Sequence, residues 1–441
     1  GHSGFPRELA AVFRRPLKPL PTTDLAQYDK LPKYDLKIND LDGCPCYACI
    51  EFNVDASRTS PLAMQRRLHA LGQRTYNLMV DVTNYCMLEL GQPTHAFDGS
   101  RLSAVRIGPL GKPGTFTTLD DQERKLTGDD LLIWNEKEPV ALAGIMGGQN
   151  SEVGLETTKV LLESANFNAA RVRRTSVRLG LRSDAAQRFE KSQPPVNTKV
   201  AVARILQLIA DSGAKLEVTS ALTVDGDPKE SFRSIELPPG SLDAMAGEAM
   251  GRKEVISILE SLGYTAEYKK DGTLAVGVPP YRSEKDISIV PDIAEEVMRV
   301  YGFGRIHPKM PSMPLKTLHV EKPIRIEHKA RRLLAGSHRF IEVHNYGWTD
   351  DNWLAALGFE PQNTIALRNP AVQSCNRMRT TLLPNLLALV GKNRTHRDAF
   401  RLFELGHIYI NRKTPTGRHK NEYRDELPRL AGISFQQSPQ P

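Results

Sequence analysis

Val80-Asp-Val-Thr-Asn-Tyr-Cys-Met-Leu-Glu-Leu-Gly-Gln-Pro-Thr-His-Ala-Phe-Asp98 is the most informative segment of this chain, and two shorter ones follow it, Leu142-Ala-Gly-Ile-Met-Gly-Gly148 and Leu161-Leu-Glu-Ser-Ala-Asn-Phe167. Each segment has a few polar side chains within an otherwise apolar run. A pocket that must recognise one functional group of a small ligand is commonly built in this way. The segments together therefore predict a small-ligand pocket.

The composition is that of an ordinary folded protein with more than one domain. A chain of 441 residues is too long for a single hydrophobic core, so we expect two to four domains. Its 40% hydrophobic and 25% charged residues exclude a largely disordered chain. No stretch approaches the ~20 apolar residues of a membrane helix, and the first residues lack a signal-peptide pattern. We therefore expect a cytoplasmic protein with no membrane partner.

The balance of charge is basic, with a formal net charge of +8 and a pI of about 9.1. Lysine and arginine side chains gain affinity for nucleic acids by displacing counterions from phosphates. Many soluble proteins are mildly basic for other reasons, so the charge supports a nucleic-acid partner without establishing one.

Three of the five cysteines fall together as Cys44-Pro-Cys46-Tyr-Ala-Cys49. Tetrahedral zinc needs four ligands, and no second pair of cysteines or histidines at ligand spacing follows nearby. We therefore expect reduced, half-buried thiols here, and neither a zinc site nor a disulfide framework.

Helix and strand signals divide the chain into successive units. Residues 1–35 open with a short helical segment, Arg7–Phe13, and continue as a proline-rich connector. Ser60 and Pro61 then suit the start of a helix over 62–72. Further along, the pattern predicts short strands, a helix and a polar hinge, within 100–135, 191–211 and 224–229.

The first long segment contains its own helix signals. Asp81 or Thr83 can cap a short helix that ends at Leu90. Thr83, Asn84 and His95 would then lie at element ends and in a loop, where ligand-binding groups usually lie.

A second unit covers residues 234–307 and has the pattern of a small α+β module. A third unit begins near Lys322 with a basic amphipathic helix. The chain begins at Gly1 and stops shortly after 430–435, which has the pattern of a strand whose partner strand is missing. We therefore expect a piece of a longer protein.

Several motifs follow one another in an order that is very unlikely to arise by chance. They are Val80–Asp98, Leu142–Gly148, Leu161–Phe167, Arg182–Lys191, Asp292–Gly302 and Arg401–Gly406. Through them the chain resembles the β subunit of bacterial-type phenylalanyl-tRNA synthetases over nearly its whole length.

The resemblance implies an α+β multidomain fold. Residues 1–35 are then a lead-in and linker, and 40–225 are a tRNA-editing domain of mixed β-sheets and helices. Residues 234–307 are a small α+β module with a nucleic-acid-binding-like fold, and 320–441 are part of a catalysis-like class II synthetase domain with an antiparallel sheet. The family's N-terminal OB-fold region and C-terminal anticodon-binding domain are absent from this chain.

The resemblance also implies the partners. The family forms a cytoplasmic heterotetramer of two α and two β subunits, which binds tRNA(Phe). Aminoacylation, with its ATP, takes place on the α subunit, and editing takes place on the β subunit. A tyrosyl or phenylalanyl group would enter the editing pocket.

An editing site must accept a tyrosyl ester and refuse a phenylalanyl ester, although the two differ by one hydroxyl. A buried hydrogen-bonding group can do this, because the ligand without the hydroxyl leaves that group unpaired. The resemblance gives this role to Glu163, whereas the residues alone equally allow a strand carboxylate paired with an arginine. Gly144 would let the backbone approach the ring, with a plain tight turn as the alternative. Ala185 matches a position where a small side chain leaves room for the ligand.

Hydrolysis needs an oriented water and donors toward the developing oxyanion. His95, Thr83 and Asn84 are the candidates, and we expect them to bind and position water rather than to act in classical base catalysis. A histidine in this context is otherwise more often a structural hydrogen-bonding group.

The chain departs from the family pattern near the candidate site. Ser183 stands where the family commonly has Thr, and Ala186 where it commonly has Ser. Ser183 keeps a hydroxyl and should function as a substrate-binding residue. Ser192-Gln-Pro-Pro replaces the usual Gly-Val-Asp-Pro, which changes the turn after Lys191.

Four carboxylates form a second constellation. Asp292, Glu295 and Glu296 lie at helical spacing on one face, and Asp286 precedes them, so their oxygens could converge on Mg²⁺. Acidic residues early in a helix also complement its dipole without any metal. The resemblance implies a magnesium site here, although the segment before Asp286 is longer than usual.

Arg401–Gly406 resembles a class II synthetase strand that would contact ATP in an α subunit. In this chain we expect a scaffold and a subunit interface instead.

Two functions remain open: an editing hydrolase within a phenylalanine–tRNA ligase, and a non-catalytic subunit for tRNA binding and assembly whose pocket has decayed. The joint presence of Glu163, His95, Thr83, Asn84 and Gly144 favours the first.

Overall fold

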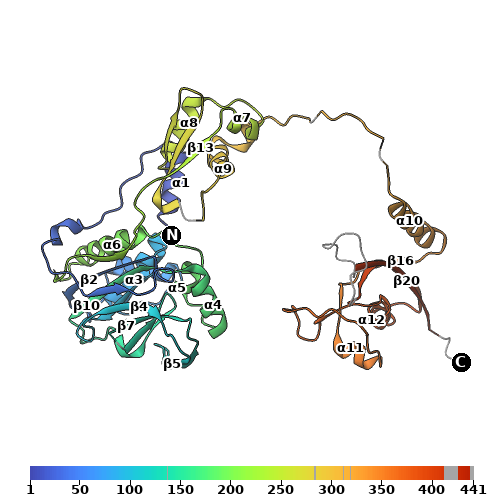
Figure 1. The fold of residues 1–441 in the computed structure, drawn as a ribbon, viewed down its shortest axis with the longest axis horizontal. Helices are drawn as coiled ribbons and strands as arrows, with labels where there is room; N and C mark the ends of the chain where they lie inside the picture. Colours follow the sequence, from blue (N-terminus) through green and yellow to red (C-terminus); the bar gives the residue numbers. More distant parts are fainter. Residues whose placement is uncertain (137, 283–284, 311, 318, 412–425, 438–441) are drawn as a thin grey trace. The chain divides into compact units, whose positions relative to one another are not determined.

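The computed structural model describes residues 1–136, 138–282, 285–310, 312–317, 319–411 and 426–437 (Figure 1). The chain divides into two compact units, Gly1–Met310 and Pro311–Pro441. Both combine helices with sheets, which confirms the predicted α+β multidomain class. In the described residues, no helix is both long and apolar enough to span a membrane.

Two sheets build the larger part of the first unit. The first sheet has the order β1-β4-β7-β8-β9, with strands Leu36–Ile38, Val105–Pro109, Leu131–Asn135, Glu138–Leu142 and Met146–Gly147. The second has the order β11-β2-β10-β3, with β12 also paired to β2, and its strands are Leu216–Val218, Cys46–Val54, Lys159–Asn166, Thr94–Asp98 and Thr223–Gly226. A hairpin of β5 (Gly114–Thr117) and β6 (Glu123–Leu126) completes the strands predicted within 100–135.

The second sheet is buried on both faces. Successive side chains of a strand point to opposite faces, so β2 and β10 contribute to two separate cores. Tyr47 and Leu161 belong to the core shared with the first sheet. Ile50 and Leu162 belong to a core that they share with helices α2 (Leu62–Ala70), α3 (Leu78–Leu90) and α6 (Asn197–Asp211). Two further helices, α4 (Ala169–Leu179) and α5 (Asp184–Phe189), follow β10 and pack against each other.

Helix α3 begins earlier than predicted. The side chain of Asn77 accepts a hydrogen bond from the Val80 N–H and caps the helix, so the start lies before Asp81. Thr83 and Asn84 therefore lie inside the helix and not at its end. The predicted end at Leu90 is confirmed.

Two other local predictions need correction. Helix α2 has Pro61 at its N-cap, and the Ser60 hydroxyl donates to Asp81 instead of capping the helix. The predicted hinge at 224–229 begins later, because Thr223–Gly226 forms strand β12 beside β2.

A three-stranded antiparallel sheet and its helices form the rest of the first unit. The sheet has the order β13-β15-β14, with strands Arg233–Leu237, Leu274–Val278 and Thr265–Tyr268. The helices are α7 (Ser241–Ala246), α8 (Arg252–Ser261) and α9 (Val290–Tyr301). Helix α1 (Gly4–Val12) contributes Ala11 to this core, so the N-terminal segment is more than a linker.

The second unit contains a sheet of order β16-β19-β20, with strands Ile341–Glu342, Ala399–Tyr409 and Glu426–Gln436. β20 pairs antiparallel with β19 along its whole length, so the strand expected to lack a partner has one. The remaining elements are α10 (Lys322–Arg331), α11 (Asp351–Ala356), α12 (Leu383–Asn393), β17 (Trp348–Thr349) and β18 (Arg377–Met378). β16 runs parallel to β19, so the sheet is mixed and not purely antiparallel.

Candidate functional site

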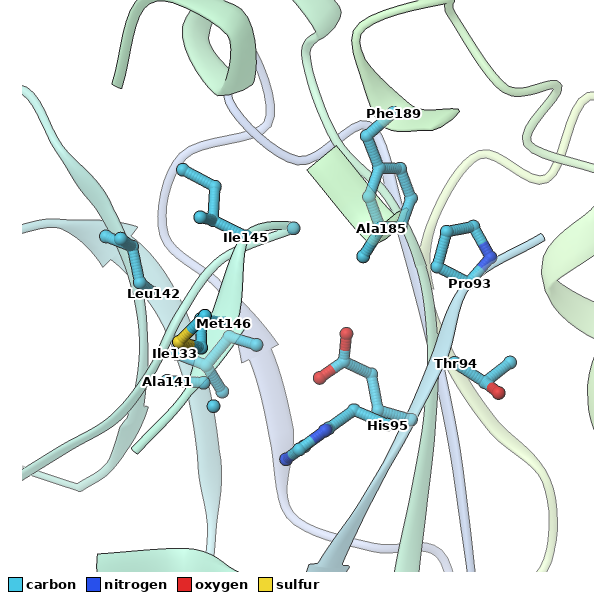
Figure 2. Close-up of a pocket in the computed structure, with 13 residues that line it drawn as sticks. Pro93, Thr94, His95, Ile133, Ala141, Leu142, Ile145, Met146, Ala185 and Phe189 are labelled. Carbon is cyan, nitrogen blue, oxygen red and sulfur yellow. The ribbon is translucent and has the colours of Figure 1, made fainter. Parts of the chain in front are cut away.

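A cavity of about 70 Å³ lies between the two sheets of the first unit. Its walls come from β3, from the end of β8 and the turn into β9, from β10 and from α5. Figure 2 shows Ala185 and Phe189 at one end and His95 and Met146 toward the other. The volume is well below the ~300–1,000 Å³ of clefts that enclose drug-sized ligands, so the cavity suits a single amino-acid side chain better than a nucleotide.

Glu163 lies in the middle of β10, between strand neighbours on both sides. The pairing register places it opposite Cys49 of β2 and opposite His95 of β3. Only 5% of its surface is exposed, and the Tyr47 hydroxyl donates to its Oε2 at 3.2 Å. Burial raises the pKa of Glu163 to about 8, although the bond from Tyr47 acts in the opposite direction. Glu163 is therefore mainly a neutral acid at pH 7.

The alternative reading of Glu163, an ion pair with an arginine, does not hold. Its side chain makes no salt bridge with any residue that the structure describes. A second oxygen, Oε1, accepts no hydrogen bond from the described residues. The carboxyl group therefore has one oxygen available to a ligand.

His95 lies on strand β3 and not in the expected loop. Its ring packs edge-on against Phe97, with ring centroids 4.5 Å apart, and burial lowers its pKa to about 4. Its Nε2 atom is buried and has no hydrogen-bond partner among the described residues. A Cβ atom on Gly147 would lie 2.8 Å from this ring, so the glycine allows the imidazole its position. His95 is thus a neutral imidazole with one unsatisfied nitrogen at the cavity wall.

Thr83 and Asn84 do not line the cavity. Both lie in α3, where the Thr83 hydroxyl donates to the Val80 carbonyl at 2.9 Å. The structure therefore does not bring them into the pocket beside Glu163 and His95, which corrects the predicted grouping. The reason is the earlier start of α3, which turns a predicted helix end into helix interior.

Gly144 and Ala185 line the opposite wall of the cavity, whereas Ser183 is not among its lining residues. Gly144 lines the cavity with φ at 69°, and a Cβ there would approach the Phe167 ring to 2.8 Å, so the turn itself accounts for a glycine here. Its approach to a ligand ring stays a prediction. The Ser183 hydroxyl accepts from the Ala186 N–H and donates to the Ile145 carbonyl at 2.6 Å. Ser183 thereby caps α5 and ties it to the turn that carries Gly144. Ala185 lines the cavity directly.

The altered turn after Lys191 keeps an unusual backbone conformation. Ser192 has φ at 59°, in the left-handed region that favours glycine. The side-chain amide of Asn166, at the end of β10, donates to the Gln193 carbonyl and ties the turn to the sheet. The substitution therefore leaves a left-handed residue at this place, at the cost of some backbone strain.

Tyr47 is the site residue that sequence reasoning missed. It is fully buried beside Glu163, and a period of two in β2 could have placed it on the same face as Cys49. Nothing in the sequence indicates that β2 pairs with β10, so only the folded structure reveals the contact between Tyr47 and Glu163.

The four carboxylates predicted to bind magnesium do not converge. Asp292 accepts from the N–H groups of Ser288 and Ile289, which lower its pKa, and Glu295 is exposed. Within the described residues, which omit 283–284, no group of three or more acidic, histidine or cysteine side chains could hold a metal ion. The prediction of a magnesium site on Asp286, Asp292, Glu295 and Glu296 is therefore not supported by this chain's own geometry.

Glu296 has a different role in the structure. Its carboxylate is buried and contacts Arg282 at 3.1 Å and Arg299 at 2.7 Å. Burial would raise its pKa, but the bonds and charges of Arg299 and Arg282 outweigh that effect and hold the pKa below its ordinary value. Arg282 also pairs with Asp286. These side chains form an ion-pair network and leave no open metal position.

Cys44, Cys46 and Cys49 are free and completely buried, more deeply than expected. Burial raises the pKa of each of these thiols. They are packing groups of the sheet core.

Glu404, within Arg401–Gly406, lies on β19, and other residues of this chain supply hydrogen bonds to its carboxylate. It accepts from Arg379 at 2.7 Å and from the Asn345 side chain at 2.8 Å, and only 1% of its surface is exposed. A carboxylate engaged in this way belongs to the scaffold of the sheet, as expected.

Family models match three successive parts of the chain. A B3/4 domain matches residues 44–214, a tRNA synthetase B5 domain matches 235–303, and a phenylalanyl tRNA synthetase beta chain CLM domain matches 306–440. The candidate cavity lies wholly within the first of these.

Curated relatives match almost the whole chain. The phenylalanine–tRNA ligase beta subunit of Solibacter usitatus is 37% identical over 94% of this chain and 54% of its own length. The corresponding subunits of Geobacillus kaustophilus and Bacillus subtilis are 35% and 34% identical, over 98% and 94% of this chain and 53% and 51% of their own lengths. This chain thus spans about half the length of the curated relatives it matches. A solved N-terminal fragment of the phenylalanyl-tRNA synthetase beta subunit from Pyrococcus horikoshii aligns with a TM-score of 0.34 at 16% identity, over 64% of this chain and 77% of that one.

Proposed function

The chain belongs to the family of phenylalanine–tRNA ligase beta subunits, and from this premise we propose that it carries the hydrolytic editing site for tyrosine mischarged onto tRNA(Phe). Residues 40–225 would be the editing domain, 234–307 the small module after it, and 320–441 the start of the catalysis-like domain. The observation that carries the proposal is the buried Glu163 carboxyl, which keeps one oxygen available in an apolar cavity.

Selectivity for tyrosine follows from this carboxyl. A phenol hydroxyl both donates and accepts, so it can pair with Glu163 whether the acid is neutral or charged. A phenylalanyl ring would cover the carboxyl and leave its free oxygen without a hydrogen-bond partner. Sites built on such a group discriminate by ~10⁴ or more, against ~10² for a bare apolar pocket.

The proposed ring position lies between the turn that carries Gly144 and the wall formed by Ala185 and Phe189 (Figure 2). Gly144 in the turn and Ala185 in the facing wall are both small residues, which leaves space for a ring between them. Ser183 would act indirectly, because its hydroxyl holds the Ile145 carbonyl and so the turn.

His95 would position the attacking water. Its neutral imidazole has an unpaired Nε2, which can accept from or donate to a water according to the tautomer. Thr83 and Asn84 would act only at the ester end of the substrate, from a helix that packs against β3.

The remaining roles concern the whole enzyme. The chain would assemble with an α subunit in an α2β2 heterotetramer, bind tRNA(Phe), and work in the cytoplasm. Aminoacylation with ATP and Mg²⁺ would take place on the α subunit. The satisfied Glu404 supports the absence of a nucleotide role for this strand.

The test is the release of tyrosine from tyrosyl-tRNA(Phe) by the wild type, Glu163→Ala and His95→Ala, with the exposed Glu156→Ala as the matched control. We expect the control to behave as the wild type and His95→Ala to release both tyrosine and phenylalanine slowly. Glu163→Ala should lose the preference for tyrosine. No release above buffer by the wild type would instead favour a non-catalytic subunit with a decayed pocket.

A further inference from the structure

The sheet register places Tyr47 diagonally across from Glu163. β2 and β10 are antiparallel, with Cys49 opposite Glu163 and Tyr47 opposite Ala165. Tyr47 and Glu163 therefore share one face of the sheet and are diagonal neighbours, a separation that aromatic side chains can bridge. Ala165 carries only a methyl group, so the Tyr47 ring has room to extend toward the carboxyl.

We infer that Tyr47 is a positioning residue that holds the Glu163 carboxyl in one orientation and so leaves its Oε1 for the substrate hydroxyl. The inference rests on the proposed editing function and adds a residue that sets its specificity. The Tyr47 hydroxyl donates to Oε2 at 3.2 Å, and no described residue bonds Oε1. One oxygen is thus held by a phenol of the protein and the other is left for a phenol of the ligand.

Tyr47 cannot itself be a substrate contact, because its side chain is completely buried. Burial, followed by the neighbouring Glu163 charge, raises the pKa of Tyr47 well above its ordinary value. The hydroxyl therefore keeps its proton near neutral pH and can donate to Oε2 whether Glu163 is neutral or charged.

Removing the hydroxyl has two consequences. A glutamate side chain without this bond can rotate about its terminal torsion, which is broad, and can present either oxygen to the cavity or neither. The bond from Tyr47 also favours the charged form of Glu163, so without it the Glu163 pKa should move above its value of about 8. A merely space-filling tyrosine would produce neither effect.

The experiment compares Tyr47→Phe with Tyr34→Phe in the full chain. Tyr34 packs against the same core and loses an equivalent bond, from its hydroxyl to the Leu102 carbonyl at 2.8 Å, but it does not contact Glu163. The measurements are the ratio of tyrosine to phenylalanine release from charged tRNA(Phe), and the Glu163 titration followed by carboxyl ¹³C NMR. We expect Tyr47→Phe to lower the ratio roughly tenfold, the factor for one hydrogen bond, and to raise the titration midpoint. Tyr34→Phe should change neither.

A double-mutant cycle with Glu163→Ala, which removes the group that accepts from Tyr47, separates positioning from folding. If Tyr47 acts through Glu163, Tyr47→Phe should lower the ratio in the wild type and should leave it unchanged when Glu163 is already alanine. An equal effect in both backgrounds, or an unshifted titration, would overturn the inference while the editing proposal stands. Absence of tyrosine release by the wild type would overturn the editing proposal, and an unshifted titration would still refute the positioning of Glu163 independently.

Discussion

Glu163 and His95 are neighbours across two strands, and burial keeps both uncharged near neutral pH. The pKa of the acid rises to about 8 and that of the imidazole falls to about 4. Each shift is a dependence of stability on pH with its own sign. The pKa of Glu163 is higher in the folded state than its ordinary value near 4.5. The stability that Glu163 contributes through this shift is therefore complete below pH 4.5 and is lost as the pH rises through 8. The contribution of His95 is complete above 6.5 and is lost as the pH falls through 4.

Glutamine at position 163 cannot ionise, so the variant should not lose stability at alkaline pH as the wild type does. We expect Glu163→Gln to gain stability relative to the wild type between about pH 5 and about pH 9, because only the wild type must then ionise a buried acid. Urea unfolding at the two pH values measures the difference. Glu156→Gln, at an exposed position, is the control and should show no such trend. A constant difference between wild type and Glu163→Gln across this range would contradict the assignment.

Gly144 allows a second prediction at this scale. Alanine there meets both a left-handed backbone and the Phe167 ring at 2.8 Å, whereas alanine at Gly180 meets φ at 67° and no atom within 4 Å. We expect Gly144→Ala to lose roughly 2–3 kcal/mol of unfolding free energy, and Gly180→Ala roughly 1 kcal/mol. The difference between the two isolates the packing against the aromatic core. Equal losses in denaturant titrations would mean that backbone strain alone accounts for Gly144.

At the scale of elements, most helix ends agree with their sequence signals and the exceptions have local causes. Helix α3 ends at Leu90 because Gly91 adopts φ of 81°, as the pattern predicts. The helix starts where the side chain of Asn77 caps it, and the sequence around Asn77 has no apolar periodicity that would predict this start. Strand β12 was not predicted, because its polar sequence lacks a strand pattern. It forms a strand because its backbone pairs with β2.

Helix α9 provides a test of the ion-pair network. Glu296→Gln should lose about 2–4 kcal/mol, because Arg282 and Arg299 would keep their charges without this buried partner. Glu295→Gln, at the exposed neighbouring position, should stay within about 0.5 kcal/mol. EDTA should leave the unfolding midpoint of the isolated chain unchanged. A fall of this midpoint with EDTA, restored by Mg²⁺, would revive the magnesium site.

For the whole molecule, the net charge of +8 includes two neighbouring arginines of helix α4. Arg173 and Arg174 are exposed on α4 and form no ion pair with the residues that the structure describes. Helix α4 packs against α5, which carries the cavity residues Ala185 and Phe189. If the chain binds tRNA(Phe) as proposed, we expect these two arginines to contact its phosphates.

The double substitution Arg173→Gln with Arg174→Gln should weaken tRNA(Phe) binding and make it less dependent on salt. Each lost contact to a phosphate of a single-stranded end lowers the slope of log affinity against log salt by about 0.7, so two contacts correspond to roughly 1.4. Fluorescence titrations over a range of salt concentrations measure the slope. Lys112→Gln with Lys215→Gln removes the same charge from exposed positions elsewhere on the first unit. An equal change of slope in this control would show only a general charge effect.

The sequence by itself determined the mixed helix and strand class of the fold and the order of its units, because hydrophobic period, glycine and proline act within a few residues. Glu163 and Gly144 became candidates through the resemblance to a known family and not through a local pattern. Only the tertiary structure decided that Thr83 and Asn84 lie outside the pocket, that Glu296 pairs with two arginines, and that Tyr47 holds Glu163. These are contacts between strands and helices that are distant in sequence. Burial and pairing across such distances determine the charge and orientation of a side chain, and no local pattern encodes them.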